Sequence, residues 1–358
     1  MLVFSAQPQG DFDRFWEIAS TAGRPYVDFP VERAPGEVAV LKIVAAVTGH
    51  RVFFGRALVL LNMAADAAII AALLWGWGAV AAVCFAIVVL PILDVLYSRI
   101  DLWSTAAATL AVAAWRRDRR DLTAGAIALG SAFKLWPLPF AVLLLTPSRV
   151  HFKLRPVLVF VGIAAGLGAL WLAFAGWSGL LQVMTFREAT GWQIESVAGS
   201  IIHLLTHAHA RFEGGSWRVG TTRGAISVVM FAVAAPGCAW SIWRAGRTGH
   251  LGAGWLAGVS ILLLCSALFS LQFMGWLVPG AAIAWAENDR RPARLAAAAL
   301  LLTGVFWRFY GLIMDGNMLA VLVVVLRNAM VAWLAISAIR VLAASPDQPR
   351  ARTSPRAE

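Results

Sequence analysis

Residues 53–75 read FFGRALVLLNMAADAAIIAALLW, and residues 79–97 read AVAAVCFAIVVLPILDVLY. Each run is about as long as the helix that crosses a hydrocarbon core of roughly 30 Å. Because unpaired backbone groups are costly in lipid, such runs are expected to be helical throughout. Further runs of this kind lie at 101–115, 156–176, 222–243, 252–270, 273–287, 294–312 and 317–341. The sequence therefore predicts an all-α, polytopic transmembrane helical bundle with about nine to eleven membrane helices.

The composition excludes a water-soluble globular protein. Of the 358 residues, 60% are hydrophobic and only 14% are charged, whereas soluble domains carry roughly 25% charged residues. The three cysteines lie within apolar stretches and lack metal-ligand spacing, so they are interpreted as small core residues.

The net charge of +11 is a topology signal. The basic residues lie in clusters between the apolar runs, which the positive-inside rule places on the cytoplasmic side of a bacterial inner membrane. Membrane lipids are thus expected partners, and nucleic acid is not. The clusters are Arg116, Arg117, Arg119 and Arg120; Arg149, Lys153 and Arg155; Arg244 and Arg247; Arg290, Arg291 and Arg294; and Arg340 to Arg356.

Three regions follow from this topology. Residues 1–52 are expected to form an extracytoplasmic first loop with an interfacial helix near Glu37 to Val47, which requires a further span upstream of residue 1. Residues 53–343 form the bundle, with an extracytoplasmic loop at 177–221, and residues 344–358 form a disordered cytoplasmic tail.

The stretch 122–145 is flanked by basic residues on both sides, so a single crossing would violate the positive-inside rule. A re-entrant helical hairpin resolves this conflict, with its break between Phe133 and Pro137, where Lys134 needs a wet or protein-lined environment. One kinked helix with a Lys134 side chain that reaches the interface is the alternative.

Charges on the extracytoplasmic side are the candidates for chemistry. Asp11 and Asp13 could supply a general base or a metal ligand, although two solvated acids near a terminus would give the same pattern. Arg99 and Asp101 lie in a short turn, where they could pair with each other or orient a polar ligand. Lys134 is a natural partner for a phosphate.

The loop 177–221 carries a further group of candidates. Arg187 could bind phosphate oxygens and Glu195 could accept hydrogen bonds from sugar hydroxyls, with a structural Arg–Glu pair as the alternative. His203, His207 and His209 resemble a metal cluster, but no acidic residue completes it, so no metal or other cofactor is indicated.

Asp66, Arg308 and Arg327 lie within or near apolar runs and must be paired or face a cavity. They could define a translocation path, which is the main argument for a transporter.

Several segments, taken in order, resemble the GT-C superfamily of membrane glycosyltransferases. The resemblance is to the bacterial polyprenyl-phosphate-mannose-dependent (α-1,2-type) mannosyltransferases of lipoglycan biosynthesis, and it covers nearly the whole chain. The matching segments are 11–15 and 26–32, 99–101, 124–137, 191–196 and 270–273 with Trp276 and Pro279. The chain departs from the family pattern at Arg33-Ala34-Pro35, where relatives continue with Tyr-Pro-Pro.

The resemblance implies a hexosyltransferase with an extracytoplasmic active site, for which a divalent metal is possible but not indicated. It would transfer a hexose, with mannose as the family-level expectation, from a polyprenyl-phosphate donor to a lipid or glycan acceptor, with inversion. Asp11 is the implied base, with Asp13 as second choice. Lys134, Arg187 and Arg99 would neutralise the donor phosphate, and the implied sugar- or acceptor-binding residues are Glu195, Gln193, Asp101 and Gln272.

Two other functions remain open at this stage. A flippase or transporter of lipid-linked sugars predicts that intramembrane charges such as Asp66 matter more than the loop acids. A non-catalytic membrane scaffold predicts that neither set matters.

Overall fold

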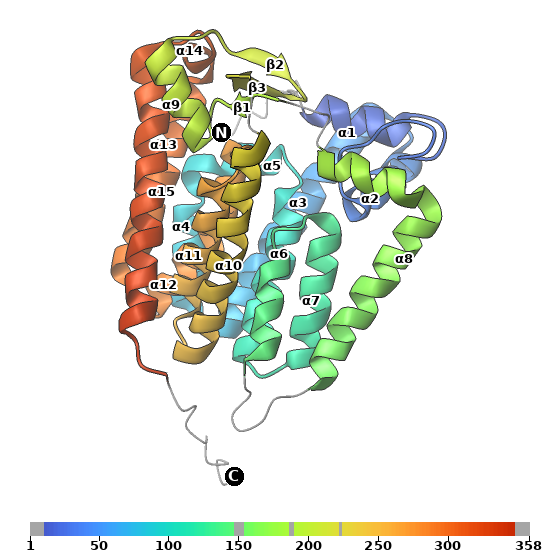
Figure 1. Cartoon of the computed structure of the whole chain (residues 1–358). Helices are drawn as coiled ribbons and strands as arrows, with labels where there is room; N and C mark the ends of the chain where they lie inside the picture. Colours follow the sequence, from blue (N-terminus) through green and yellow to red (C-terminus); the bar gives the residue numbers. More distant parts are fainter. Residues whose placement is uncertain (1–10, 147–153, 186–189, 222–223, 348–358) are drawn as a thin grey trace.

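The computed structural model describes residues 11–146, 154–185, 190–221 and 224–347. Helices make up 79% of the structure, so the all-α class is confirmed. Figure 1 shows the helices as a bundle, with short helices and a small sheet gathered at one end.

Among the described residues, five helical segments are long and apolar enough to cross a membrane. This identifies a helical membrane protein, while the number of nine to eleven membrane helices stays a prediction. The five segments are α3 (Arg51–Trp77), α4 (Ala79–Val88) continued through η1 (Leu90–Ile92) and α5 (Leu93–Tyr97), α8 (Leu154–Thr185), α10 (Gly224–Thr248) and α15 (Met318–Ala344).

Shorter helices complete the bundle between these segments. They are α6 (Asp101–Arg116), α7 (Arg120–Phe133), η2 (Leu138–Leu145), α11 (Leu251–Leu264), η4 (Leu271–Leu277), α12 (Val278–Ala286), α13 (Arg290–Arg308) and α14 (Tyr310–Met314). The expected span 79–97 is interrupted at Pro91, which lies within η1, because proline cannot continue the α-helical hydrogen bonds.

The segment 120–146 follows the path of a hairpin. Helix α7 ends at Phe133, the backbone of Lys134 is extended, and η2 runs back from Leu138. The carbonyl of Leu143 then accepts hydrogen bonds from Trp115 Nε1 at 3.1 Å and from Arg120 Nη1 at 3.3 Å. The chain has therefore returned to the level at which α7 began, which is the path expected from the sequence and not that of one kinked helix.

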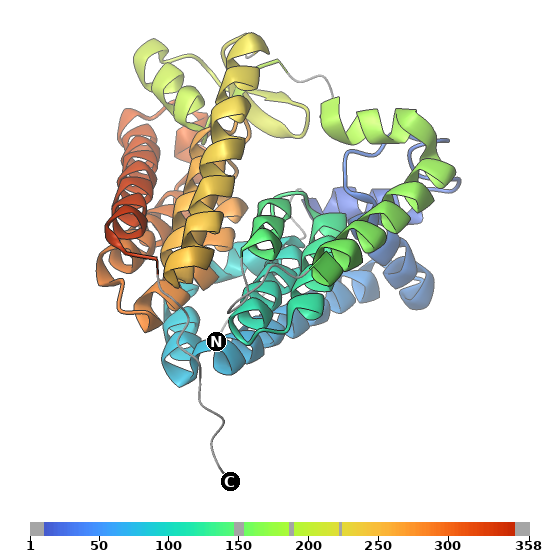
Figure 2. The same cartoon turned by 60° about the horizontal axis from the view of Figure 1, so that its bottom comes forward.

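Helix α8 differs from its expected bounds. It does not end at 176 but continues to Thr185 and changes direction at Gly176, whose φ of 65° lies in the left-handed region. Helix α8 packs along α7 and η2, and Ala175 and Gln182 contact Tyr26 and Val31 of the N-terminal segment. Figure 2 shows α8 at the edge of the molecule.

After α8, the expected loop contains regular structure. Helix α9 (Val197–Thr206) and three antiparallel strands, in the order β1-β3-β2, occupy this region. The strands are β1 (Trp192–Gln193), β2 (Arg211–Glu213) and β3 (Ser216–Val219).

The N-terminal segment forms two helices at the same end of the bundle as the sheet (Figure 1). They are α1 (Asp11–Ser20) and α2 (Pro35–Thr48), the latter at the expected position of the interfacial helix. Phe15 of α1 and Leu41 of α2 are buried together with Phe54 of α3. This segment is therefore packed onto the bundle by an apolar contact of its own.

The opposite end carries the arginine clusters. There Arg116 pairs with Glu287 at 3.3 Å, and Asp347 pairs with both Arg244 and Arg247. The expected disordered tail, residues 344–358, begins at the last residue of α15, and residues 348–358 lie outside the described part of the chain.

Aromatic rings pack tightly at the centre of the bundle. Trp136 stacks on Trp276 with ring centroids 4.9 Å apart, and Trp255 donates a hydrogen bond from Nε1 to the carbonyl of Trp276 at 2.6 Å. Small residues allow the neighbouring helices to approach: a Cβ atom on Gly252 of α11 would lie 2.1 Å from the backbone nitrogen of Ala284 in α12. This contact leaves no room for a side chain.

We therefore expect Gly252→Ala to lower the free energy of unfolding by about 1–3 kcal/mol, because α11 and α12 must separate. The matched control is Gly162→Ala in α8, where no atom lies within 4 Å of the added Cβ. Thermal unfolding in detergent measures both variants. Equal stability of the two would contradict the close packing of α11 on α12.

Candidate functional site

Asp11 is held by two arginines from different parts of the chain. It is the first residue of α1. Its carboxylate forms ion pairs with Arg99, in the turn before α6, and with Arg33 Nη2 at 3.3 Å. The Asp11 side chain is 24% exposed, so the carboxylate is pre-oriented and still reachable.

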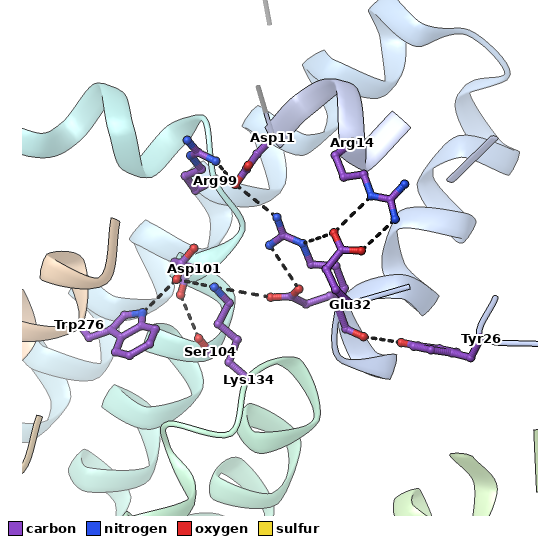
Figure 3. Close-up of polar contacts among 11 residues, drawn as sticks. Asp11, Arg14, Tyr26, Glu32, Arg99, Asp101, Ser104, Lys134 and Trp276 are labelled. Carbon is purple, nitrogen blue, oxygen red and sulfur yellow. Dashed lines mark hydrogen bonds and ion pairs between the residues drawn. The ribbon is translucent and has the colours of Figure 1, made fainter. Parts of the chain in front are cut away.

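Asp101 and Lys134 form a second, more deeply placed ion pair, at 2.6 Å (Figure 3). Asp101 begins α6, and Lys134 lies at the break between α7 and η2. Trp276 donates from Nε1 to the same carboxylate oxygen at 3.1 Å. The Asp101 side chain is only 2% exposed, so Lys134 compensates a charge that is almost fully removed from water.

Glu37 connects the two pairs. Its carboxylate lies 3.9 Å from Lys134 Nζ and 3.8 Å from Arg33 Nη1. Burial raises the pKa of Glu37 from 4.5 to about 7, although the charges of Lys134 and Arg33 act in the opposite direction. Glu37 is therefore a carboxyl that can be neutral or charged near neutral pH.

Glu32 and Arg14 extend the same network on the side of α1, with Arg14 Nη2 2.9 Å from Glu32 Oε2. Tyr26 donates a hydrogen bond to the carbonyl of Arg33 at 2.6 Å and so holds the connecting loop. Figure 3 shows these side chains converging from the N-terminal segment, the turn before α6 and the break after α7.

The charges of this network balance. Its members are the carboxylates Asp11, Glu32, Glu37 and Asp101 and the cations Arg14, Arg33, Arg99 and Lys134. We call these eight residues the charge network. Because each cation contacts a carboxylate, an anionic ligand can exchange with those carboxylates without leaving a cation unpaired.

Aromatic rings lie beside Lys134. Its Nζ is 5.2 Å from the ring centroid of Phe273 and 5.8 Å from that of Trp276, and these two rings stack at 4.4 Å. The rings stabilise the cation and present an apolar face next to the polar one. Gln272, a candidate sugar-binding residue, precedes Phe273 and accepts a hydrogen bond from Ser270 at 2.5 Å.

Glu195 lies in a neighbouring buried group. Its backbone carbonyl accepts hydrogen bonds from Arg327 Nη2 at 2.9 Å and from Asn328 Nδ2 at 3.2 Å, both on α15. Burial raises the pKa of the Glu195 carboxyl, while the charge of Arg327 and a hydrogen bond with Tyr310 lower it. Burial lowers the pKa of the Arg99 guanidinium, whereas the charges of Asp101 and Glu195 raise it. Arg99, a member of the charge network, thus connects the network to this group.

The other predicted residues have different environments. Asp13 is 56% exposed and pairs with Arg51, apart from the partners of Asp11. Gln193 is buried in β1, and its side-chain oxygen has no hydrogen-bond partner in the described part of the chain. Arg187 lies outside the described residues.

The three proposed translocation residues do not share partners. Asp66 accepts a hydrogen bond from Tyr97 at 3.1 Å, Arg308 lies 3.3 Å from Asp94, and Arg327 binds the backbone of Glu195. Each has its own local partner, although Asp66 Oδ1 and Arg327 Nε and Nη1 are buried without a hydrogen-bond partner among the described residues.

Sequence reasoning did not identify Arg33 and Glu37 as site residues. Arg33 was noted only as a departure from the family pattern, and Glu37 only as the start of an amphipathic stretch. Their i, i+4 spacing is the sole local signal, and it is common on helices. In the described part of the chain, no group of three or more His, Cys, Asp or Glu residues could hold a metal ion.

No model of a known protein family matches the chain, and a search of curated proteins found none that matches it.

The raised pKa of Glu37 predicts a pH dependence of stability. Below pH ~4.5 the carboxyl is protonated in both the folded and the unfolded chain; as the pH rises to about 7, the unfolded chain loses the proton first. Stability should therefore fall by about 3 kcal/mol across this window and then level off.

Glu37→Gln should reduce this fall, which unfolding in detergent from pH 4.5 to 8 measures. Part of the fall should remain, because burial also raises the pKa values of Glu195 and Glu287. Glu17→Gln, on the exposed side of α1, should keep the wild-type profile. An unchanged profile in Glu37→Gln would show that Glu37 ionises normally.

Removing the Lys134 charge should be costly. Lys134→Met leaves the buried Asp101 carboxylate without its closest ion pair, which we expect to cost about 3–5 kcal/mol. Adding Asp101→Asn should recover part of the loss, because Asn is neutral and still accepts from Trp276. In contrast, Arg51→Met breaks the exposed pair with Asp13 and should cost about 1 kcal/mol or less. Chemical unfolding of five proteins is the measurement: the wild type, Lys134→Met, Asp101→Asn, the double variant and Arg51→Met. Additive effects of Lys134→Met and Asp101→Asn would contradict the pair.

Proposed function

We propose that the chain is a membrane glycosyltransferase that moves a hexose from a polyprenyl-phosphate donor to a hydroxyl group of a lipid or glycan acceptor. The observation that carries this proposal is the charge network: a reachable carboxylate, Asp11, lies against two arginines, next to a largely buried lysine, Lys134. Transfer from a phosphate-linked sugar needs a base for the acceptor and cations for the departing phosphate. Both kinds of group are present at one end of the bundle.

Asp11 is the proposed base. Alone with Arg99 and Arg33 it is a poor base, because two cations stabilise its charged form. The donor phosphate competes for these arginines, since guanidinium groups bind phosphate in a forked geometry. Donor binding would then release Asp11 towards the acceptor hydroxyl.

The proposed reaction is a single displacement. The acceptor oxygen forms a bond to the anomeric carbon of the sugar while its proton passes to the Asp11 carboxylate. The bond between that carbon and the phosphate oxygen breaks, and the polyprenyl phosphate leaves with the electron pair. Arg99, Arg33 and Lys134 stabilise the charge that develops on the leaving oxygen. One displacement inverts the anomeric configuration.

Asp101 and Glu37 are proposed as positioning residues for Lys134, because both contact its ammonium group. Gln272, Phe273, Glu195 and Gln193 are proposed to bind the sugar or acceptor. The family resemblance of the segments 11–15, 99–101 and 124–137 supports the same assignment.

We further propose that the charge network faces the extracytoplasmic side of a bacterial inner membrane in a GT-C-type bundle. The distribution of arginines supports this orientation, because their clusters gather at the opposite end. A flippase for lipid-linked sugars is the second candidate function. It receives less support, because Asp66, Arg308 and Arg327 have separate partners.

The test is sugar transfer from a radiolabelled polyprenyl-phosphate sugar to endogenous lipids in membranes, with mannose, glucose and arabinose as the sugars. Asp11→Asn should lower the rate about 10²- to 10⁴-fold, because the amide cannot accept the proton. Asp13→Asn is the matched control on the same helix turn and should retain the wild-type rate within about twofold.

Two outcomes would change the proposal. A wild-type rate in Asp11→Asn would remove Asp11 as the base. No transfer of any of the three sugars by well-folded wild-type protein would place the flippase first, and a flipping assay with Asp66→Asn would then follow.

A further inference from the structure

Two surface hollows meet at Trp75, near the C-terminal end of α3. The first has a volume of about 390 Å³ and is lined by small and apolar residues of α3 and α6, among them Ala68, Ala71, Ala107 and Leu110. The second has a volume of about 580 Å³ and is lined by charged residues around the start of α7. Both volumes fall in the range of small-molecule sites, roughly 300–1,000 Å³.

The second hollow has an excess of positive charge. Arg120 Nε lies 3.0 Å from Asp118 Oδ1, and Arg155 Nη2 lies 3.0 Å from Asp121 Oδ2. Arg119 also lines this hollow and is exposed, and it has no carboxylate partner among the described residues. A ligand that complements this surface must therefore carry negative charge.

Arg120 is a second arginine that lines this hollow, and one of its nitrogens has no hydrogen bond within the described chain. Its side chain is 5% exposed, yet Nη2 is buried with no hydrogen-bond partner within the described chain. Its other nitrogens bind Asp118 and the carbonyl of Leu143. A guanidinium group with an unpaired buried N–H is costly unless negative charge lies nearby.

The two hollows differ in polarity as the two parts of a lipid do. Ala68 to Trp75 belong to a segment that can cross a membrane, so the first hollow lies at the depth of acyl chains. The second lies at the end of this segment, where headgroups are found. Arg117 caps the C-terminal end of helix α3 here, because its Nε donates a hydrogen bond to the carbonyl of Trp75 at 2.7 Å.

We propose that this pair of hollows binds an anionic phospholipid, with its phosphate group beside Arg119 and Arg120 and one acyl chain between α3 and α6. A free phosphate would leave the alanine-lined hollow empty. A zwitterionic lipid would bring a positive group beside Arg119. The site lies at the basic end of the bundle, away from the charge network, so it does not depend on the proposed reaction.

Native mass spectrometry of the detergent-solubilised protein, titrated with phosphatidylglycerol or phosphatidylcholine, tests the proposal. Wild-type protein should bind phosphatidylglycerol more tightly than phosphatidylcholine. Arg119→Ala should weaken phosphatidylglycerol binding about fivefold, the effect of one basic residue near an anionic headgroup. Ala71→Phe should weaken binding of both lipids, because the ring fills the first hollow.

Each variant has a matched control. Arg294→Ala removes an exposed arginine of α13, and Ala67→Phe adds the same ring to an exposed position of α3 that does not line the hollow. Both should bind phosphatidylglycerol as the wild type does. All four altered positions have partly or fully exposed side chains, so melting temperatures should stay near the wild-type value.

Three results would overturn the proposal. They are equal affinity of the wild type for the two lipids, equal losses in the variants and their controls, and full displacement of phosphatidylglycerol by inorganic phosphate. The last result would identify a site for a soluble anion.

Discussion

A buried carboxylate that needs a cation beside it is the constraint on which this end of the molecule depends. Asp101 can stay out of water only because it is paired with Lys134, whose side chain is itself largely buried. Pairing brings the break after α7 against the first turn of α6, and it brings η4 to the same place through Trp276. With Lys134 held there, the chain turns at Pro137 and returns as η2. The hairpin at 120–146, the packed tryptophan rings and the deeply placed part of the charge network thus all depend on the ion pair between Lys134 and Asp101.

The N-terminal segment is attached to the Lys134–Asp101 pair by ionic contacts, and to the bundle by apolar contacts. Arg33 and Glu37 lie at the start of α2, and they join Asp11 on one side to Lys134 on the other. In this arrangement Asp11, Arg33, Glu37 and Lys134 each have at least two neighbours of opposite sign. An incoming phosphate can therefore displace Asp11 from Arg99 without exposing an unpaired charge, which lowers the cost of rearrangement during the proposed reaction.

The two ends of the bundle use arginine differently. Within the charge network, Arg33 and Arg99 are largely buried and paired with carboxylates. At the opposite end, Arg119 and Arg155 are exposed around a hollow that continues into an alanine-lined surface. Paired, shielded arginines suit the selection of one anionic group, whereas exposed arginines suit attraction to a charged membrane surface.

The sequence by itself determined the helical membrane class and most helix positions, because length and hydropathy are local properties. The expected 101–115 became α6 (Asp101–Arg116), and 317–341 became α15 (Met318–Ala344). Local patterns also marked Asp11, Arg99, Asp101 and Lys134 as unusual charges. Only the tertiary structure decided their partners: that Lys134 binds Asp101, that Arg33 and Glu37 belong to the same network, and that α8 continues past Gly176. Ion pairing of this kind depends on which distant segments the packed helices bring together, and residue spacing along the chain carries no record of that.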